Sequence, residues 1–188
     1  MIARSCGVLL HPTSLPGPFG VGDLGPAAHH WVERLAGAGQ GWWQVLPLGP
    51  TGYADSPYQS PSTFAGNLNL ISPEALEADG LASPADVAAC ELPADGPVVF
   101  ADVIPRKRRL VRTAWERFEA GEGTSDLRAA FDAFAETEAD WLDEYAVFAA
   151  IKDAHDGAPW WAWPPDLAAR TATDRRLVSF AGGVAVHR

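Results

Sequence analysis

The sequence is organised around the residues Gly41-Trp42-Trp43-Gln44-Val45-Leu46-Pro47-Leu48-Gly49-Pro50-Thr51-Gly52-Tyr53-Ala54-Asp55-Ser56-Pro57-Tyr58-Gln59-Ser60. Its first half contains a short apolar run, Trp42–Leu46, bounded by glycine and proline, which predicts a buried strand. Its second half is rich in turn-forming residues and carries tyrosine, serine, aspartate and glutamine side chains. A buried strand followed by a polar and aromatic loop is a common way for α/β proteins to build a ligand site.

The residues before this stretch predict another strand and a helix. Residues 5–11 form a short apolar run that ends at Pro12, because proline cannot continue a central ladder. A loop rich in glycine and proline follows, and Pro26 occupies a favoured helix-start position. Strand, loop, helix and strand in this order form a βαβ unit, so the two strands are expected to be parallel. The loops 12–25 and 47–70 then leave the same carboxyl edge of the sheet, where α/β proteins place their sites.

Beyond Pro73 the sequence becomes acidic and helix-like. Residues 105–118 and 126–155 predict two long helices, after a region with short helical pieces. In the second helix, large apolar side chains recur at spacings of three and four, which predicts a stripe that faces the core. The stripe consists of Leu127, Phe131, Phe134, Trp141, Leu142, Tyr145 and Phe148. The proline- and tryptophan-rich segment Pro159–Pro165 predicts a rigid loop, and another helix is expected to begin at Asp166.

Composition and charge restrict the classes of function. The 188 residues, 47% apolar and 20% charged, are typical of a globular chain. The net charge of −10 argues against a nucleic-acid surface. The N-terminal apolar run is too short for a signal peptide or a membrane span, so the sequence predicts a cytoplasmic protein without membrane partners. A basic cluster is expected to be a solvated helix face that pairs with neighbouring acids: Arg106, Lys107, Arg108, Arg109 and Arg112.

The histidines and cysteines do not predict a metal centre. Cys6 and Cys90 fit no metal-ligand spacing and are interpreted as two reduced thiols, with Cys6 buried in the first strand. His29, His30 and Glu33 include an i, i+4 pair, but they lack a further ligand cluster nearby. We therefore expect them on a solvated helix face.

Two other patterns suggest chemistry that their surroundings do not support. Gly20-Val21-Gly22-Asp23-Leu24-Gly25 matches the dinucleotide pattern GxGxxG, which would indicate a nucleotide-binding oxidoreductase. These glycines do not directly follow a strand, and no acid lies near Val45, where a ribose ligand is expected. Asp23 is therefore expected to tie down the glycine loop or cap the helix. His11 and Ser14 suggest nucleophilic catalysis, but they lack a GxSxG elbow and a third partner.

The loop after the second strand has the chemistry of a sugar-binding site. Tyr53 and Tyr58 offer flat apolar faces with a hydroxyl group, and Ser56 and Gln59 offer directional hydrogen bonds. This mixture suits a sugar, whose ring has an apolar CH face and a rim of hydroxyls. Glycosyl chemistry also needs a pair of carboxylates flanking the bond. Asp55 is better explained by shaping the Asp-Ser-Pro turn, so no catalytic pair can be named.

Four segments together resemble one known family. They are Gly7-Val-Leu-Leu-His-Pro-Thr-Ser-Leu-Pro-Gly-Pro-Phe-Gly-Val-Gly-Asp-Leu-Gly25, Trp42-Trp-Gln-Val-Leu-Pro-Leu-Gly-Pro-Thr-Gly-Tyr53, Asp55-Ser-Pro-Tyr-Gln-Ser60 and Phe64-Ala-Gly-Asn67. These segments resemble the 4-α-glucanotransferases (amylomaltases or disproportionating enzymes, glycoside hydrolase family 77). The resemblance covers essentially the whole chain.

The resemblance implies an α/β fold: the N-terminal portion of a (β/α)8 TIM barrel, namely its first two strands, with a mainly helical inserted subdomain. It assigns residues 1–72 to the start of the catalytic barrel and 73–165 to the helical insertion. Residues 166–188 are expected to return towards the barrel, which is then truncated. Since a full barrel takes about 250 residues, the chain is expected to be only the N-terminal part of the enzyme.

The resemblance also implies a function. Family members transfer α-1,4-glucan segments between maltooligosaccharides by a retaining double displacement, without a cofactor or a metal. The expected partners are α-1,4-glucans, that is, maltooligosaccharides and starch- or glycogen-like chains. The family's aspartate nucleophile, glutamate acid/base and third carboxylate have no counterparts here, so the chain is expected to be inactive alone. The alternative is a non-catalytic carbohydrate-binding module that keeps the wall of the glucan cleft.

The resemblance suggests roles for individual residues. Tyr58 resembles the tyrosine that packs against the sugar next to the scissile bond. Tyr53 resembles an aromatic residue at a second glucan-binding position, and Phe100 aligns with the partner of that position. Ala54 stands where the family usually has glycine, which is expected to alter the dihedral angles of the turn. The expected substrate-binding residues are Tyr53, Asp55, Ser56, Tyr58, Gln59 and Phe100.

Overall fold

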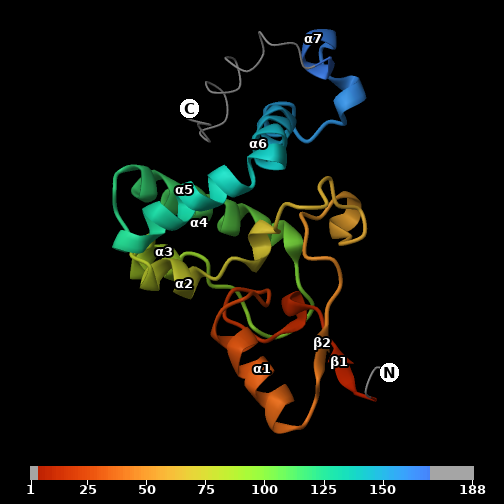
Figure 1. The fold of residues 1–188 in the computed structure, drawn as a ribbon, viewed down its shortest axis with the longest axis vertical. Helices are drawn as coiled ribbons and strands as arrows, with labels where there is room; N and C mark the ends of the chain where they lie inside the picture. The colour runs from red at the N-terminus through yellow and green to blue at the C-terminus, as the bar shows by residue number, and fades with distance from the viewer. Residues whose placement is uncertain (1–3, 170–188) are drawn as a thin grey trace. The chain divides into compact units, whose positions relative to one another are not determined.

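The computed structural model describes residues 4–169, which divide into two compact units, one up to Arg128 and one from Ala129 onward. The elements are β1 (Gly7–Leu9), the 3-10 turn η1 (Pro12–Ser14), α1 (Pro26–Gly37), β2 (Trp42–Gln44), η2 (Tyr53–Asp55), η3 (Leu68–Leu70), α2 (Pro73–Ala78), α3 (Pro84–Ala88), α4 (Phe100–Glu119), α5 (Ser125–Thr137), α6 (Ala139–Ala154), η4 (Trp160–Ala162) and α7 (Pro165–Ala168) (Figure 1). Within the described residues, none of the helices combines the length and apolar character needed to span a bilayer.

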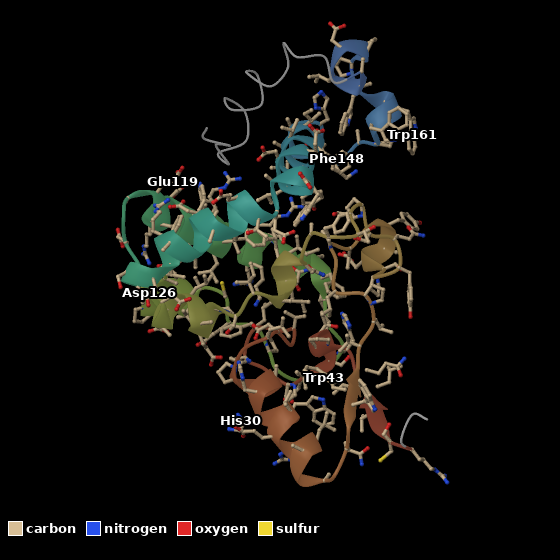
Figure 2. All side chains as sticks on the ribbon, in the orientation of Figure 1. His30, Trp43, Glu119, Asp126, Phe148 and Trp161 are labelled. Carbon is tan, nitrogen blue, oxygen red and sulfur yellow. The ribbon has the colours of Figure 1, made fainter. Side chains whose placement is uncertain are left out.

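The two strands and the helix between them form the predicted βαβ unit. β1 and β2 pair in parallel, with Val8 opposite Trp43. α1 begins with Pro26 at its first position, and Gly39 just beyond its end has a φ of 71°. Trp43 lies between β2 and α1 and donates its indole N–H to the carbonyl oxygen of Leu10 at 2.7 Å (Figure 2). The prediction of a parallel pair is therefore confirmed.

The strands are shorter and more exposed than the sequence predicts. Leu9 is 56% exposed, Trp42 is 66% exposed, and Cys6 is exposed as well. Strand side chains alternate between two faces. The half-buried Val8 and Trp43 share one face, whereas Leu9 and Trp42 lie on the other. The prediction of two buried strands with a buried Cys6 is wrong. An apolar strand pattern indicates that both faces of a strand favour burial, but it does not show whether other elements pack against them.

Helices α2, α3 and α4 build the core of the first unit. Phe19, from the glycine loop, packs in a buried cluster with Cys90 and Leu110. A second buried cluster is formed by Leu81, Ala114 and Phe118. α3 begins at a capping box in which Ser83 and Asp86 exchange hydrogen bonds, and Arg117 of α4 pairs with Asp86 at 2.7 Å.

The basic cluster on α4 includes a buried lysine. Lys107 is 2% exposed, pairs with Asp23 at 2.8 Å and donates to the carbonyl oxygen of Ile71 at 2.6 Å. The lysine ammonium also lies 5.5 Å from the ring centre of Phe19. Asp23 accepts the backbone N–H of Gly25 at 3.0 Å, so it ties down the glycine loop as predicted. The prediction of a solvated face is wrong for Lys107, because the buried side of α4 passes over a buried carboxylate that compensates its charge.

The region predicted as one helix over residues 126–155 contains two helices, α5 and α6, with Glu138 between them at φ −101°. Phe131 and Phe134 are 36% and 49% exposed, so the prediction of a buried aromatic stripe is wrong at these positions. Periodicity shows which side chains share a face, but it does not show what covers that face.

The second unit has its own buried cluster around Ile151 and Trp163. Trp163 donates its indole N–H to the carbonyl oxygen of Ala158 at 3.0 Å, and its ring packs 5.6 Å from that of Phe148. This indole anchors the proline- and tryptophan-rich segment that contains η4, at the position where the sequence predicts a rigid loop. Trp161, in the same turn, is 72% exposed (Figure 2).

Candidate functional site

The candidate site loop, residues 47–67, leaves the carboxyl end of β2 and contains η2 (Figure 1). Since β1 and β2 are parallel, the glycine loop that follows β1 leaves the same edge of the sheet. The two ends of the site loop are joined by a hydrogen bond from the backbone N–H of Asn67 to the carbonyl oxygen of Leu48, at 3.0 Å. The loop is thus closed at its base.

Two glycines lie where opposite sides of this loop touch. A Cβ atom added to Gly52 would overlap the carbonyl oxygen of Gln59. A Cβ atom added to Gly49 would lie 2.7 Å from the hydroxyl oxygen of Ser60. The Ser60 hydroxyl in turn donates to the carbonyl oxygen of Ser62 at 2.6 Å. We call the contacts Gly49–Ser60 and Gly52–Gln59 the loop clasp.

The turn inside the clasp has an unusual backbone. Ala54 and Asp55 are consecutive non-glycine residues with a φ of 54° each. Asp55 donates its backbone N–H to the carbonyl oxygen of Gly52 at 3.2 Å, and Ser56 donates to that of Tyr53 at 3.3 Å. The left-handed conformation of Ala54 explains why glycine suits this position, and it means that the alanine is held there at a conformational cost.

Five of the six expected substrate-binding residues lie together in this loop. Tyr53 and Tyr58 are 83% and 71% exposed. Gln59 is exposed, and Ser56 and Asp55 are half-buried. The hydroxyl oxygen of Ser56 accepts the backbone N–H of Tyr58 at 3.3 Å. The Ser56 hydroxyl therefore stabilises the turn as an acceptor and keeps its own O–H as a donor.

Phe100 comes from a different element. It is the first residue of α4 and is half-buried. α4 packs against η3, which follows the site loop in the chain. Phe100 therefore belongs to the helix that supports the end of the site loop, and its role remains a prediction.

His11 lies in an environment that its sequence neighbours do not indicate. Ser14 donates its backbone N–H to the carbonyl oxygen of His11 at 2.9 Å, which is a turn contact. The Nδ1 atom of His11 is buried and, in the part of the chain that the structure describes, has no hydrogen-bond partner. Burial lowers the pKa of His11. No sequence signal could reveal this environment, because it depends on packing at the end of β1.

The remaining polar candidates do not form a reactive centre. Asp23 is buried and ion-paired with Lys107, so its carboxylate is occupied. Over residues 4–169, no three His, Cys, Asp or Glu side chains gather closely enough to hold a metal ion. His29, His30 and Glu33 are exposed on α1, as predicted, and His30 points outward from the helix (Figure 2).

Comparison with known proteins gives a consistent family. The family model described as 4-alpha-glucanotransferase, glycoside hydrolase family 77, matches residues 10–181. The 4-alpha-glucanotransferase of Thermus thermophilus is 46% identical over 169 residues, which are 90% of this chain and 33% of the relative. That of Synechocystis sp. is 40% identical over 171 residues, 90% of this chain and 34% of the relative.

A solved structure supports the same family. The amylomaltase from Streptococcus agalactiae in complex with acarbose matches 95% of this chain and 37% of its own, with a TM-score of 0.78 and 29% sequence identity. The chain thus spans about a third of the length of these relatives. The expectation that it forms an N-terminal portion of the family's barrel, with two parallel strands and mainly helical additions, is confirmed. Because the family model covers residues 10–181 and the fold matches an amylomaltase, this chain belongs to the 4-α-glucanotransferase family.

Proposed function

We propose that this chain forms the glucan-binding wall of a 4-α-glucanotransferase, which transfers α-1,4-glucan segments between maltooligosaccharides by a retaining double displacement. The observation that carries the proposal is the pair of exposed tyrosines, Tyr53 and Tyr58, on one short closed loop of a family member. Aromatic rings held in solvent by a fixed backbone suit the apolar CH faces of glucose units. Maltooligosaccharides and starch- or glycogen-like chains are the expected ligands.

Each residue of the site loop makes a different contact with the glucan. Tyr58 packs against the sugar next to the scissile bond, and Tyr53 holds a more distant glucose unit together with Phe100. Ser56 donates its O–H to a sugar hydroxyl, since its oxygen already accepts from the backbone. Gln59 supplies a carboxamide that both donates and accepts. Asp55, next to Ser56 in the chain, contributes a carboxylate acceptor at the rim.

The carboxylates that cleave the glycosidic bond are supplied from outside this sequence. A retaining mechanism requires a nucleophile and an acid/base placed on either side of the bond. The ion pair of Asp23 with Lys107 and the turn position of Asp55 support this assignment, because neither carboxylate is placed as half of such a pair.

Calorimetric titration with maltoheptaose tests the binding role. Tyr58→Ala and Tyr53→Ala should each weaken binding about tenfold, since an aromatic contact contributes on the order of 1 kcal/mol beyond its buried area. Trp161→Ala is the matched control, because Trp161 is also highly exposed but lies in the other unit. Equal losses in all three variants, or no binding by the unchanged chain, would contradict the proposal. The purified chain should not disproportionate maltotriose.

The binding-module alternative rests on the same loop and on the buried, ion-paired Asp23. The two proposals differ when the missing part is supplied separately. We expect this chain, mixed with the complementary two-thirds of the Thermus thermophilus relative, to restore transfer of glucan segments. Glucan binding without any restored transfer would favour the binding module.

We also infer that the protein works in the cytoplasm. The support is the state of its two cysteines, which are free thiols, exposed at Cys6 and buried at Cys90. Free thiols are typical of reducing compartments. Fractionation of the native cells followed by immunodetection tests this inference, and recovery outside the cytoplasmic fraction would contradict it.

A further inference from the structure

Gly52 lies where the two sides of the site loop come into contact. Its backbone has a φ of −105° and a ψ of −132°. A Cβ atom at this position would overlap the carbonyl oxygen of Gln59 and lie 3.2 Å from its carbonyl carbon and its Cβ. These atoms are the backbone carbonyl group and the Cβ atom of Gln59, which cannot rotate away as the end of a flexible side chain can. The absence of a side chain at Gly52 therefore allows the two sides of the site loop to touch.

The contact between Gly52 and Gln59 joins the two ends of the segment that carries both tyrosines. Tyr53 directly follows Gly52, and Tyr58 directly precedes Gln59. The backbone between them is fixed by the turn bonds to the carbonyl oxygens of Gly52, Tyr53 and Ser56. A change in the spacing between Gly52 and Gln59 is therefore transmitted to both tyrosine positions.

Resting on the proposed function, we propose that Gly52 is a positioning residue whose contact with Gln59 sets the spacing of Tyr53 and Tyr58, so that one α-1,4-glucan chain stacks on both rings. The affinity then depends on glucan length. A glucan long enough to reach both rings gains from the fixed spacing, whereas maltose contacts one ring at a time and gains little.

Gly52→Ala and Gly66→Ala form a matched pair for the test. Gly66 lies in the same loop, and a Cβ atom added there meets nothing within 4 Å. Both variants make the same chemical change and the same change in the unfolded chain, so a difference between them reports the folded surroundings of the two glycines. By calorimetry, Gly52→Ala should weaken maltoheptaose binding about tenfold, as expected when one aromatic contact is lost. Maltose binding should change much less, and Gly66→Ala should match the unchanged chain with both sugars.

Fluorine NMR on fluorotyrosine-labelled protein gives a readout that does not need a sugar. The chain has three tyrosines, at positions 53, 58 and 145. Gly52→Ala should shift the Tyr53 and Tyr58 resonances and leave Tyr145 in place, and Gly66→Ala should shift none of them. An unchanged Tyr145 signal shows only that the second unit remains folded, because Tyr145 packs against Trp141 and Phe148. The fold of the first unit is checked by an unchanged thermal unfolding curve followed by circular dichroism.

The outcomes separate this inference from the proposed function. If the unchanged chain binds no glucan, the proposed function fails and this use of the clasp fails with it. If the unchanged chain binds and Gly52→Ala binds maltoheptaose equally well, or loses maltose to the same degree, the positioning role alone is refuted. Should Gly52→Ala not fold, Gly49→Ala replaces it, because the nearest neighbour of the added Cβ atom is a side-chain atom, the Ser60 hydroxyl oxygen at 2.7 Å, and not a backbone atom as at Gly52. Gly49→Ala should also weaken maltoheptaose binding relative to maltose binding, but by a smaller factor than Gly52→Ala. An unchanged ratio of the maltoheptaose and maltose affinities would overturn the inference.

Discussion

Lys107→Met is expected to destabilise the first unit strongly. Lys107 is 2% exposed and pairs at 2.8 Å with Asp23, which is 6% exposed. Methionine keeps much of the apolar stem but leaves the Asp23 carboxylate and the Ile71 carbonyl without their cationic donor. Removing one partner of a buried pair costs about 3–5 kcal/mol, because the remaining charge stays buried and uncompensated. For a chain of this size this corresponds to a fall in Tm of roughly 6–20 °C.

Thermal unfolding followed by circular dichroism measures this change. Arg112→Met on the same helix is the matched control, since Arg112 is exposed, and it should alter Tm by no more than about 1–2 °C. Combining Lys107→Met with Asp23→Asn should recover part of the loss, because the unpaired charge is then removed. A Tm for Lys107→Met equal to that of Arg112→Met would refute the account of the buried pair.

Three further predictions concern backbone strain and pH. Ala54→Gly should raise the stability by up to about 1 kcal/mol, because relief of the left-handed alanine (about 1–2 kcal/mol) exceeds the entropic cost of glycine (about 0.5–1 kcal/mol); a lower Tm would contradict this. In the folded protein, burial lowers the pKa of His11 below its ordinary 6.5. The unfolded chain therefore binds the proton more readily, and the free energy of unfolding should decrease as the pH falls from about 6.5. His11→Gln should remove part of this decrease, and identical pH profiles of Tm for the variant and the unchanged chain would refute the role of His11. Hydrogen bonds from Ser83, and to a smaller extent from Arg117, hold the pKa of Asp86 below 3.8. The contribution of the ionised Asp86 carboxylate to stability is therefore present above pH 3.8 and is lost as the pH falls through the lowered pKa. Asp86→Asn should lower the free energy of unfolding by about 1 kcal/mol near neutral pH. On acidification this variant should lose less stability than the unchanged chain. Equal losses of stability on acidification would show that Asp86 does not contribute.

Local patterns in the sequence predicted the elements that depend on nearby residues. The Pro26 helix start, the parallel strands and the turn-rich loop with Tyr53 and Tyr58 all follow from short-range signals. The role of Asp23 in holding the glycine loop also follows from the sequence, since it depends on Gly25, two residues away. The resemblance to the 4-α-glucanotransferases added the barrel and the function, which local patterns do not contain.

Features that depend on distant residues could not be predicted in the same way. Lys107 looks like its arginine neighbours in sequence, and only the long-range contact with Asp23 makes it a buried residue. Trp42 has an apolar strand pattern, but its exposure depends on what covers its face of the sheet. The close approach of Gly52 to Gln59 is likewise invisible in sequence, because it depends on how the loop returns on itself.

Fluorine NMR spectra recorded during a maltoheptaose titration show whether the loop carrying Tyr53 and Tyr58 binds a glucan. With all three tyrosines labelled, the Tyr53 and Tyr58 resonances should shift together with one binding constant, whereas Tyr145 should stay unchanged. Unchanged Tyr53 and Tyr58 resonances at saturating maltoheptaose would show that this loop is not a glucan-binding site.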